Sequence, residues 1–307
     1  MTVGDTSEAE HFRTQGHAVI DLAADYLAAA FQGTLPVLPW REPDQSVDAY
    51  ATSFSEKQPL VPLLQRVLTE SVHVHHPRCV GHQVAAVLPD AALTELLNAL
   101  LANGMAVYEM GPASVPMERA VVRWMCNQLG FDANSDGILT GGGSTGNLTA
   151  LLAARQDRAG FDVWKDGAHG GPPLTVLASD QAHYSVRRTV QIMGWGHLGV
   201  ATVPTDAAYR IDPAALATTL QAAQNAGRRV VALVASAGST ATGSFDPLEP
   251  LGRFCKEHGL WFHVDGAHGA SVSLSSKHRS LLKGIERADS VVWDGHKLMM
   301  LPSLVTG

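Results

Sequence analysis

Lys297, near the end of the given sequence, has surroundings suited to nucleophilic catalysis. Lys297 follows a β-branched run at residues 290–293 and a turn at Asp294-Gly295, and apolar residues come directly after it. Such a position is poorly solvated, and desolvation favours the neutral amine, which can form a Schiff base with an aldehyde. A surface lysine after a strand would show the same local pattern, so residues upstream must decide between these interpretations.

A glycine-rich segment could hold a phosphate. It lies between an expected strand, 137–140, and an expected helix, 145–158, and contains Gly143, Ser144 and Thr145. Glycines let a ligand approach the backbone, while the start of a helix offers free N–H groups and the positive end of its dipole. The segment lacks both the GK[ST] ending of a P-loop and the GxGxxG pattern of dinucleotide sites. Taken alone, it is explained equally well as a tight turn with a Ser/Thr cap.

Two other strand ends carry candidate ligand contacts. His183 follows the expected strand 175–178 and could stack on an aromatic cofactor, donate a proton or cap the next helix. Thr240 lies after the expected strand 229–235, in a segment rich in small hydroxyl residues. It could hydrogen-bond a ligand or belong to an ordinary polar loop.

The segment His263-Val-Asp265-Gly-Ala267-His268 supports two interpretations. Asp265 closes an apolar strand, where an unpaired carboxylate would be costly to bury, so it needs a cationic partner. A protonated pyridine nitrogen would suit, since Gly266 and Ala267 leave room for a flat group. Alternatively, His263, Asp265 and His268 could bind zinc in a metal-dependent hydrolase.

The elements expected to position these residues alternate between strands and helices. The expected strands are 137–140, 175–178, 200–203, 229–235, 260–265 and 290–293, and the helices between them include 145–158, 184–193, 213–225 and 247–258, with a helical stretch to residue 287. This alternation predicts an α/β fold with a mostly parallel sheet and helices on both faces. Ligands bind such sheets at the carboxyl ends of the strands, where all the candidates lie. Upstream we expect a helix at 11–31, an extended connector at 34–50 and helices at 90–103 and 115–129.

Composition narrows the function classes. With 307 residues, 46% apolar and 17% charged, the chain is long enough for a substantial globular core. A net charge of -7 without blocks of like charge gives no indication of a nucleic-acid partner, and no apolar run is long enough to span a membrane. Three widely spaced cysteines and an acidic, polar N-terminus favour a cytoplasmic protein without a disulfide framework or a metal site of the CxxC type.

Taken in order, these motifs describe a pocket for pyridoxal 5'-phosphate. The chain resembles the group II amino acid decarboxylases, which include the aromatic amino acid, glutamate and 2,4-diaminobutyrate decarboxylases. The resemblance rests on residues 140–147, His183 to Arg188, Gly238 to Thr240 with Ser244 to Asp246, His263 to Ala267, and Asp294 to Lys297. Gly266, Ser239, Gly295 and Leu298 depart from the residues common in the family, which leaves the substrate class open.

The resemblance implies a role for each candidate. Lys297 would form the Schiff base with the cofactor, Asp265 would pair with the ring nitrogen, and His183 would stack on the ring and handle protons. The other implied cofactor contacts are Gly143, Ser144 and Thr145 on the phosphate, with help from His296, Ala267 on the ring face, and Thr240 near the ring substituents or substrate. No bound metal is implied.

The resemblance also implies an architecture and an activity. We expect a fold type I large domain at 76–307 after an N-terminal helical arm and connector at 1–75. Because relatives continue past the lysine, the chain is expected to be truncated and to lack the small C-terminal domain, which a second chain could supply. The expected activity is decarboxylation of an L-amino acid by a homodimer. Another pyridoxal-phosphate lyase, an aldehyde synthase, an aminotransferase and a catalytically silent subunit are alternatives.

Overall fold

The computed structural model describes residues 6–56, 58–81, 83–303 and 305–307. The chain divides into two compact units, Met1–Ala86 and Val87–Gly307. The division into functional domains after residue 75 stays a prediction. Within the described ranges, no helix combines the length and the apolar character needed to cross a membrane.

The first unit is helical. Its helices are α1 (Thr6–Phe31), α2 (Pro43–Ser55) and α3 (Leu60–Glu70). The expectation of an extended connector at 34–50 is therefore wrong from residue 43 onward. Pro43 occupies the first turn of α2, where a missing N–H costs nothing, so this proline begins a helix rather than preventing one. Arg66 of α3 joins this helix to α2, since its guanidinium donates to Ser53 Oγ at 2.9 Å and lies 4.5 Å from the centre of the Tyr50 ring.

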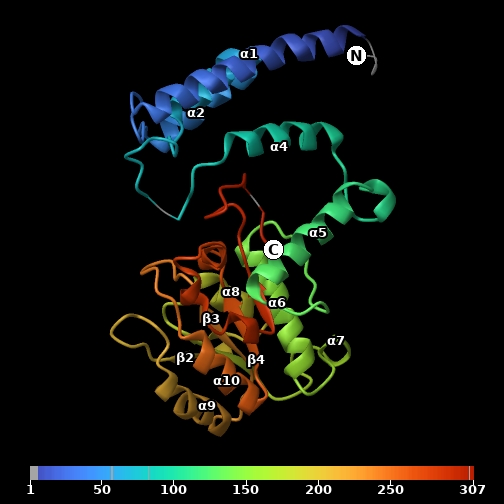
Figure 1. Cartoon of the computed structure of the whole chain (residues 1–307), viewed down its shortest axis with the longest axis vertical. Coiled ribbons are helices and arrows are strands. Elements are labelled where there is room, and N and C mark those ends of the chain that lie inside the picture. Colours follow the sequence, from blue (N-terminus) through green and yellow to red (C-terminus); the bar gives the residue numbers. More distant parts are fainter. Residues whose placement is uncertain (1–5, 57, 82, 304) are drawn as a thin grey trace. The chain divides into compact units, whose positions relative to one another are not determined.

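The second unit contains a five-stranded parallel sheet with the order β2-β1-β3-β4-β5 (Figure 1). The strands are β1 (Leu174–Ser179), β2 (Val200–Val203), β3 (Arg229–Ser236), β4 (Trp261–Asp265) and β5 (Ser290–Val292). The helices are α4 (Pro89–Leu101), α5 (Ser114–Leu129), α6 (Gly143–Arg158), α7 (Val163–Asp166), α8 (Tyr184–Ile192), α9 (Leu216–Asn225) and α10 (Leu248–His258). Short 3-10 helices occupy Tyr108–Met110, His197–Gly199, Pro213–Ala215, Gly269–Leu274, Arg279–Leu282 and Ile285–Arg287. The expected α/β architecture is confirmed.

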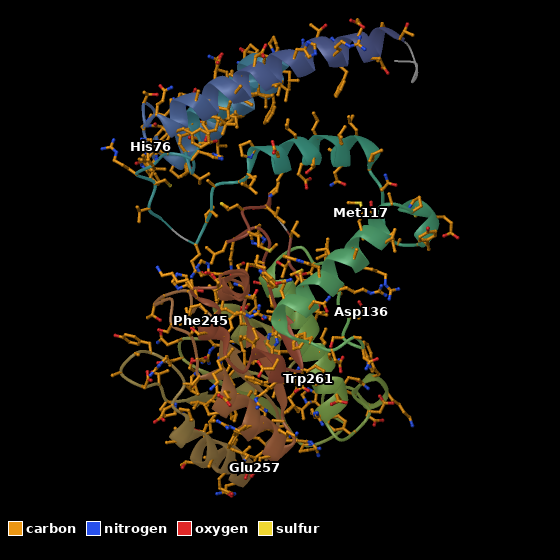
Figure 2. All side chains as sticks on the ribbon, in the orientation of Figure 1. His76, Met117, Asp136, Phe245, Glu257 and Trp261 are labelled. Carbon is orange, nitrogen blue, oxygen red and sulfur yellow. The ribbon has the colours of Figure 1, made fainter. Side chains whose placement is uncertain are left out.

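Each face of the sheet has its own apolar core, because successive side chains of a strand point to opposite faces. In β3, Val234 packs in the core that includes side chains of α6 and α8, whereas Leu233 packs in the core that includes side chains of α9 and α10. Both strand positions are fully buried, which explains the continuous apolar run in the sequence. Polar side chains such as Glu257 lie on the exposed outer face of the helices (Figure 2).

Two expected elements differ in the structure. Residues 137–140 form no strand; Thr140 makes a single antiparallel bridge with Thr306, which also bridges Asp294. The outer edge of β5 consequently borders a groove of about 360 Å³ rather than a neighbouring strand. The helical stretch expected up to residue 287 consists of short 3-10 helices and turns. Glycines at 266, 269 and 284 in this stretch interrupt regular α-helix.

Candidate active site

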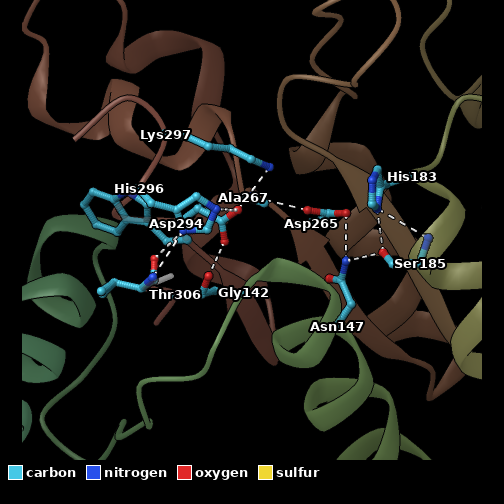
Figure 3. A network of polar contacts seen from close by, with 12 residues as sticks. Gly142, Asn147, His183, Ser185, Asp265, Ala267, Asp294, His296, Lys297 and Thr306 are labelled. Atoms are coloured by element: carbon cyan, nitrogen blue, oxygen red, sulfur yellow. Dashed lines mark hydrogen bonds and ion pairs between the residues drawn. The ribbon is translucent and has the colours of Figure 1, made fainter. Parts of the chain in front are cut away.

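The candidate residues gather at one edge of the sheet. The parallel strands β1, β4 and β5 end there, and they lead directly to His183, Asp265 and Asp294. The start of α6 lies at the same edge, because Asn147 in its second turn contacts Asp265 (Figure 3). In addition, Thr140 in the preceding loop pairs with Thr306, which bridges Asp294. Residues that are remote from one another in the sequence thus form one polar network.

Asp265 is a buried carboxylate without a basic partner. The residue is only 8% exposed. Its Oδ2 accepts a hydrogen bond from Asn147 Nδ2 at 2.9 Å, and its Oδ1 accepts one from the Ala267 backbone N–H at 3.2 Å. Among the described residues, no lysine, arginine or histidine forms an ion pair with it. A buried anion held only by neutral donors can accept a cation, so the site fits a protonated ring nitrogen.

His183 occupies the position before the first residue of α8. Its Nδ1 accepts a hydrogen bond from the Ser185 backbone N–H and lies 2.8 Å from Ser185 Oγ, while its ring contacts the Tyr184 ring at 4.1 Å. Both the capping role and a position beside the cofactor are therefore compatible with one geometry.

Burial lowers the pKa of the His183 imidazole. The carboxylates of Asp265 and Asp294 oppose this effect, and the positive charges of Lys297 and Arg188 reinforce it. The lowered pKa favours a neutral ring near pH 7.

Lys297 forms an ion pair rather than standing among apolar groups. Its Nζ lies 3.0 Å from Oδ2 of Asp294, and its side chain is 22% exposed. Asp294 is almost fully buried and also accepts a hydrogen bond from Thr306 Oγ1 at 2.6 Å. The structure therefore places the Lys297 amine against a carboxylate, where the sequence pattern had indicated apolar surroundings. Nucleophilic attack by Nζ requires that this ion pair open.

The α6 N-terminus lies beside this ion pair. A Cβ added to Gly143 would come within 3.0 Å of Asp294 Oδ1 and 3.2 Å of the Ala267 Cβ. The backbone N–H groups of Gly143 and Ser144 make no hydrogen bond to any residue that the structure describes. They are therefore free to bind an anion such as a phosphate, as the sequence pattern indicates.

His296 is turned toward its own segment. Its Nε2 lies 3.5 Å from Asp294 Oδ2 and its Nδ1 lies 3.0 Å from the Val305 carbonyl oxygen. The side chain is 15% exposed, and among the described residues its hydrogen bonds and ion pairs are with Asp294 and Val305.

Thr240 is not brought into the polar network. It is exposed in the loop after β3, whose neighbouring hydroxyls, Ser239 and Thr242, bond to each other at 2.6 Å. Asp246 anchors this loop, since its buried carboxylate accepts hydrogen bonds from the backbone N–H groups of Ile211 and Ser236 at 2.7 and 2.6 Å. Burial raises the pKa of Asp246 to about 6.

The alternative zinc site is not assembled by these side chains. Both ring nitrogens of His263 are engaged, Nε2 with Asn147 Oδ1 at 2.8 Å and Nδ1 with Ser290 Oγ at 2.9 Å. In the described ranges, no three His, Cys, Asp or Glu residues are grouped as metal ligands. The donor geometry therefore disfavours a metal hydrolase using His263, Asp265 and His268.

One protein-family model matches most of the chain. A family model described as the pyridoxal-dependent decarboxylase conserved domain matches residues 46–306. The chain belongs to this family. The resemblance to group II decarboxylases is thereby confirmed. The cofactor of this decarboxylase family is pyridoxal phosphate.

Individual relatives agree with the family. The chain is 35% identical over 267 residues to human cysteine sulfinic acid decarboxylase, covering 86% of this chain and 54% of that protein. It is 31% identical over 253 residues to L-2,4-diaminobutyrate decarboxylase of Acinetobacter baumannii, covering 78% of this chain and 50% of that protein. The crystal structure of mouse CSAD superposes with a TM-score of 0.90 at 30% identity, covering 98% of this chain and 64% of that one. The chain thus spans about half the length of the curated relatives it matches.

Several residues of this decarboxylase-family site were not singled out from sequence. Asn147, Ser185 and Asp294 stand inside the motifs, yet their types alone suggest caps or turns. Nothing in the sequence around Thr306 indicates a role in the site, because its hydrogen bond to Asp294 forms only when the folded chain brings the two residues together. A search for polar residues just after a buried strand could have found Asp294, which follows β5, whereas Asn147 lies inside a helix and carries no such signal.

Proposed function

We propose that the chain binds pyridoxal 5'-phosphate through Lys297 and takes part in decarboxylation of an L-amino acid to the amine and CO₂. The observation that carries the proposal is Asp265, a buried carboxylate without a basic side-chain partner among the described residues, on the same sheet edge as Lys297 and the start of α6. Pyridoxal phosphate supplies an aldehyde that condenses with amines and a ring that accepts the electron pair left by departing CO₂.

Three residues perform the chemical roles in this proposal. Lys297 provides the amine that holds the cofactor, after its ion pair with Asp294 has opened. Asp265 keeps a proton on the ring nitrogen, since its buried negative charge favours the protonated form. His183 packs against the ring and, as a neutral imidazole, can donate a hydrogen bond without adding positive charge.

The remaining site residues bind and orient. The N–H groups of Gly143 and Ser144 and the hydroxyls of Ser144 and Thr145 hold the phosphate, and His296 closes that side of the site. Ala267, whose backbone N–H bonds to the Asp265 carboxylate, would contact the cofactor ring. Thr240 approaches the substrate from the loop after β3.

The activity is tested by incubating the purified protein and pyridoxal phosphate with a panel of amino acids. The panel includes cysteine sulfinate and 2,4-diaminobutyrate, because two relatives are named for these substrates. Release of CO₂ together with the matching amine supports decarboxylation. A keto acid product instead indicates an aminotransferase, and an aldehyde indicates an aldehyde synthase. Binding of the cofactor without any turnover would indicate a silent subunit or a need for a second chain.

Gly143→Ala is expected to weaken pyridoxal phosphate binding by about 10-fold. The added methyl group would lie 3.0 Å from Asp294 Oδ1 and 3.2 Å from the Ala267 Cβ, so the cradle must shift. A shift that weakens one or two phosphate hydrogen bonds costs about 1.5 kcal/mol, which corresponds to that change in Kd. Fluorescence titration with pyridoxal phosphate measures the effect.

Gly141→Ala is the matched control, because no atom lies within 4 Å of its added Cβ. It should bind the cofactor like wild type. Equal affinity of both variants would place the phosphate away from the start of α6.

We also propose that the chain forms a homodimer through α4. This helix presents a stripe of leucines, with Leu97 61% exposed and Leu101 70% exposed. Burying two leucines stabilises an interface by about 3–6 kcal/mol, so Leu97→Glu with Leu101→Glu should weaken dimerisation at least about 100-fold. Light scattering after size exclusion should give the dimer mass for wild type and the monomer mass for this variant. Leu198→Glu, at a leucine that is 68% exposed outside α4, should stay dimeric. A monomeric wild type would contradict the proposal.

A further inference from the structure

A buried asparagine, Asn147, bonds directly to Asp265 and is linked through Ser185 to His183. Asp265 and His183 are the two residues proposed to lie beside the cofactor ring. Asn147 is 1% exposed, and its side chain has three partners. Two of them, Asp265 and Ser185, are seen in Figure 3. Nδ2 lies 2.9 Å from Asp265 Oδ2 and 2.9 Å from Ser185 Oγ, and Oδ1 lies 2.8 Å from His263 Nε2. The amide thus uses both of its hydrogens and its oxygen.

The direction of these hydrogen bonds is set by Asp265. A carboxylate oxygen only accepts hydrogen bonds, so the amide NH₂ of Asn147 must face it. The opposite orientation would place two oxygens in contact within a buried site, which is strongly unfavourable. Asn147 Oδ1 is therefore an acceptor, and the atom facing it, Nε2 of His263, must donate.

The chain of hydrogen bonds continues from His263 to the start of β4. Nδ1 of His263 lies 2.9 Å from Ser290 Oγ, which accepts a hydrogen bond from the Trp261 indole N–H at 2.8 Å. The indole can only donate, and Ser290 has one hydroxyl hydrogen to give to Nδ1. His263 is then neutral with its proton on Nε2, which agrees with its complete burial and lowered pKa.

The other branch ends at His183. Ser185 Oγ accepts a hydrogen bond from Asn147, so its own hydrogen is free to be donated to His183 Nδ1 at 2.8 Å. The Ser185 backbone N–H points to the same nitrogen at 3.3 Å. Two donors converging on Nδ1 make it an acceptor, so the proton of neutral His183 lies on Nε2.

We propose that Asn147 is a positioning residue that couples Asp265 to His183, and that this hydrogen-bond chain fixes His183 as the neutral tautomer protonated on Nε2. The chain runs from Trp261 through Ser290, His263 and Asn147 to the Asp265 carboxylate, with a branch through Ser185 to His183. Its consequence is that His183 presents an N–H donor, not a lone pair, on the ring edge that makes no hydrogen bond to described residues. The catalytic value of that donor rests on the proposed function, whereas the tautomer does not.

Nitrogen NMR of histidine-labelled full-length protein tests the proposal, before and after addition of pyridoxal phosphate. His183→Gln and His263→Gln assign the two signals. We expect wild-type His183 and His263 both to show a protonated Nε2 and an unprotonated Nδ1 near pH 7. A wild-type His183 that is protonated on Nδ1, alone or in the imidazolium form, would overturn the proposal.

Asn147→Asp should reverse the hydrogen bond to Ser185 and replace the amide oxygen that accepts from His263 with a carboxylate oxygen. His263 would then donate to a carboxylate, which should raise its titration midpoint by about one to three pH units. Ser185 would donate its hydroxyl hydrogen to the introduced carboxylate, leaving its Oγ as an acceptor that favours a proton on His183 Nδ1. Pyridoxal phosphate affinity should also fall, since two carboxylates would face each other beside the ring nitrogen.

Two further variants keep the proposal decidable if Asn147→Asp does not fold. Ser185→Ala should raise the titration midpoint of His183 by about one unit, through loss of one hydrogen bond to the neutral ring, and leave His263 unchanged. Asn134→Asp makes the same chemical change as Asn147→Asp on an exposed turn and should alter neither histidine. Unchanged His183 signals in folded Ser185→Ala or Asn147→Asp would show that the chain does not control this residue. Because these spectra need no turnover, they separate failure of the proposal from failure of the decarboxylase function.

Discussion

Replacing Lys297 with alanine is expected to lower kcat for decarboxylation by on the order of 10⁴-fold or more, as removal of a covalent nucleophile does in other enzymes. The lysine supplies the only amine proposed to hold the cofactor, and its Nζ lies at the sheet edge 3.0 Å from the buried Asp294 carboxylate. Because free pyridoxal phosphate retains slow chemistry of its own, residual turnover rather than complete silence is expected. Steady-state kinetics with the amino acid identified from the panel gives kcat.

Lys277→Ala provides the matched control for this loss. Lys277 is exposed in a turn that contributes no residue to the candidate site, so its removal should leave kcat unchanged. Thermal unfolding of both variants checks that the fold is retained. Wild-type turnover by a folded Lys297→Ala protein would refute the assignment of this lysine.

Asp265→Asn is expected to lower kcat by about 10²–10³-fold at saturating cofactor, comparable to loss of one preorganised electrostatic group. The substitution keeps the shape of the side chain and an oxygen for the Asn147 amide, but it removes the negative charge. A ring nitrogen without a carboxylate partner loses its proton more readily, and the ring then accepts electrons less well. The free energy of unfolding should change little or rise, because an unpaired buried charge is costly in the absence of cofactor.

The control for this variant is Asp180→Asn. Asp180 follows β1 at the same sheet edge but is exposed and bonds only to Gln181 among the described residues. It should retain wild-type kcat and cofactor affinity. Equal effects of both substitutions would mean that general electrostatics of the edge, not a specific contact of Asp265, supports the reaction.

The sequence predicted the fold well where the signal was local. Continuous apolar runs, such as 229–235, indicated strands covered on both faces, and their regular alternation with helices indicated a parallel sheet. Once the sheet is parallel, the rule that ligands gather at carboxyl ends of strands brings His183, Asp265 and Lys297 to one edge. Their convergence in the structure follows from topology rather than from any motif taken singly.

Features that depend on long-range contact could not be predicted in this way. The environment of Lys297 is dominated by Asp294, which the sequence places in a turn but the fold buries. Asn147 acquires its three partners from α8 and β4, 38 to 118 positions away. Residues 137–140 have a strand-like composition, yet they pair with Thr306 at one position only, so no regular strand forms. In each case the deciding partner is fixed by the fold rather than by the local pattern.

Reductive trapping of the cofactor on the protein tests the assignment of Lys297. After addition of pyridoxal phosphate, the protein should turn yellow, and borohydride should fix one cofactor per chain. Peptide mapping by mass spectrometry should then find the adduct on Lys297, in the peptide that contains the sequence Asp294-Gly-His-Lys297. An adduct on any other lysine, or no adduct on a protein that binds the cofactor, would contradict a Schiff base at Lys297.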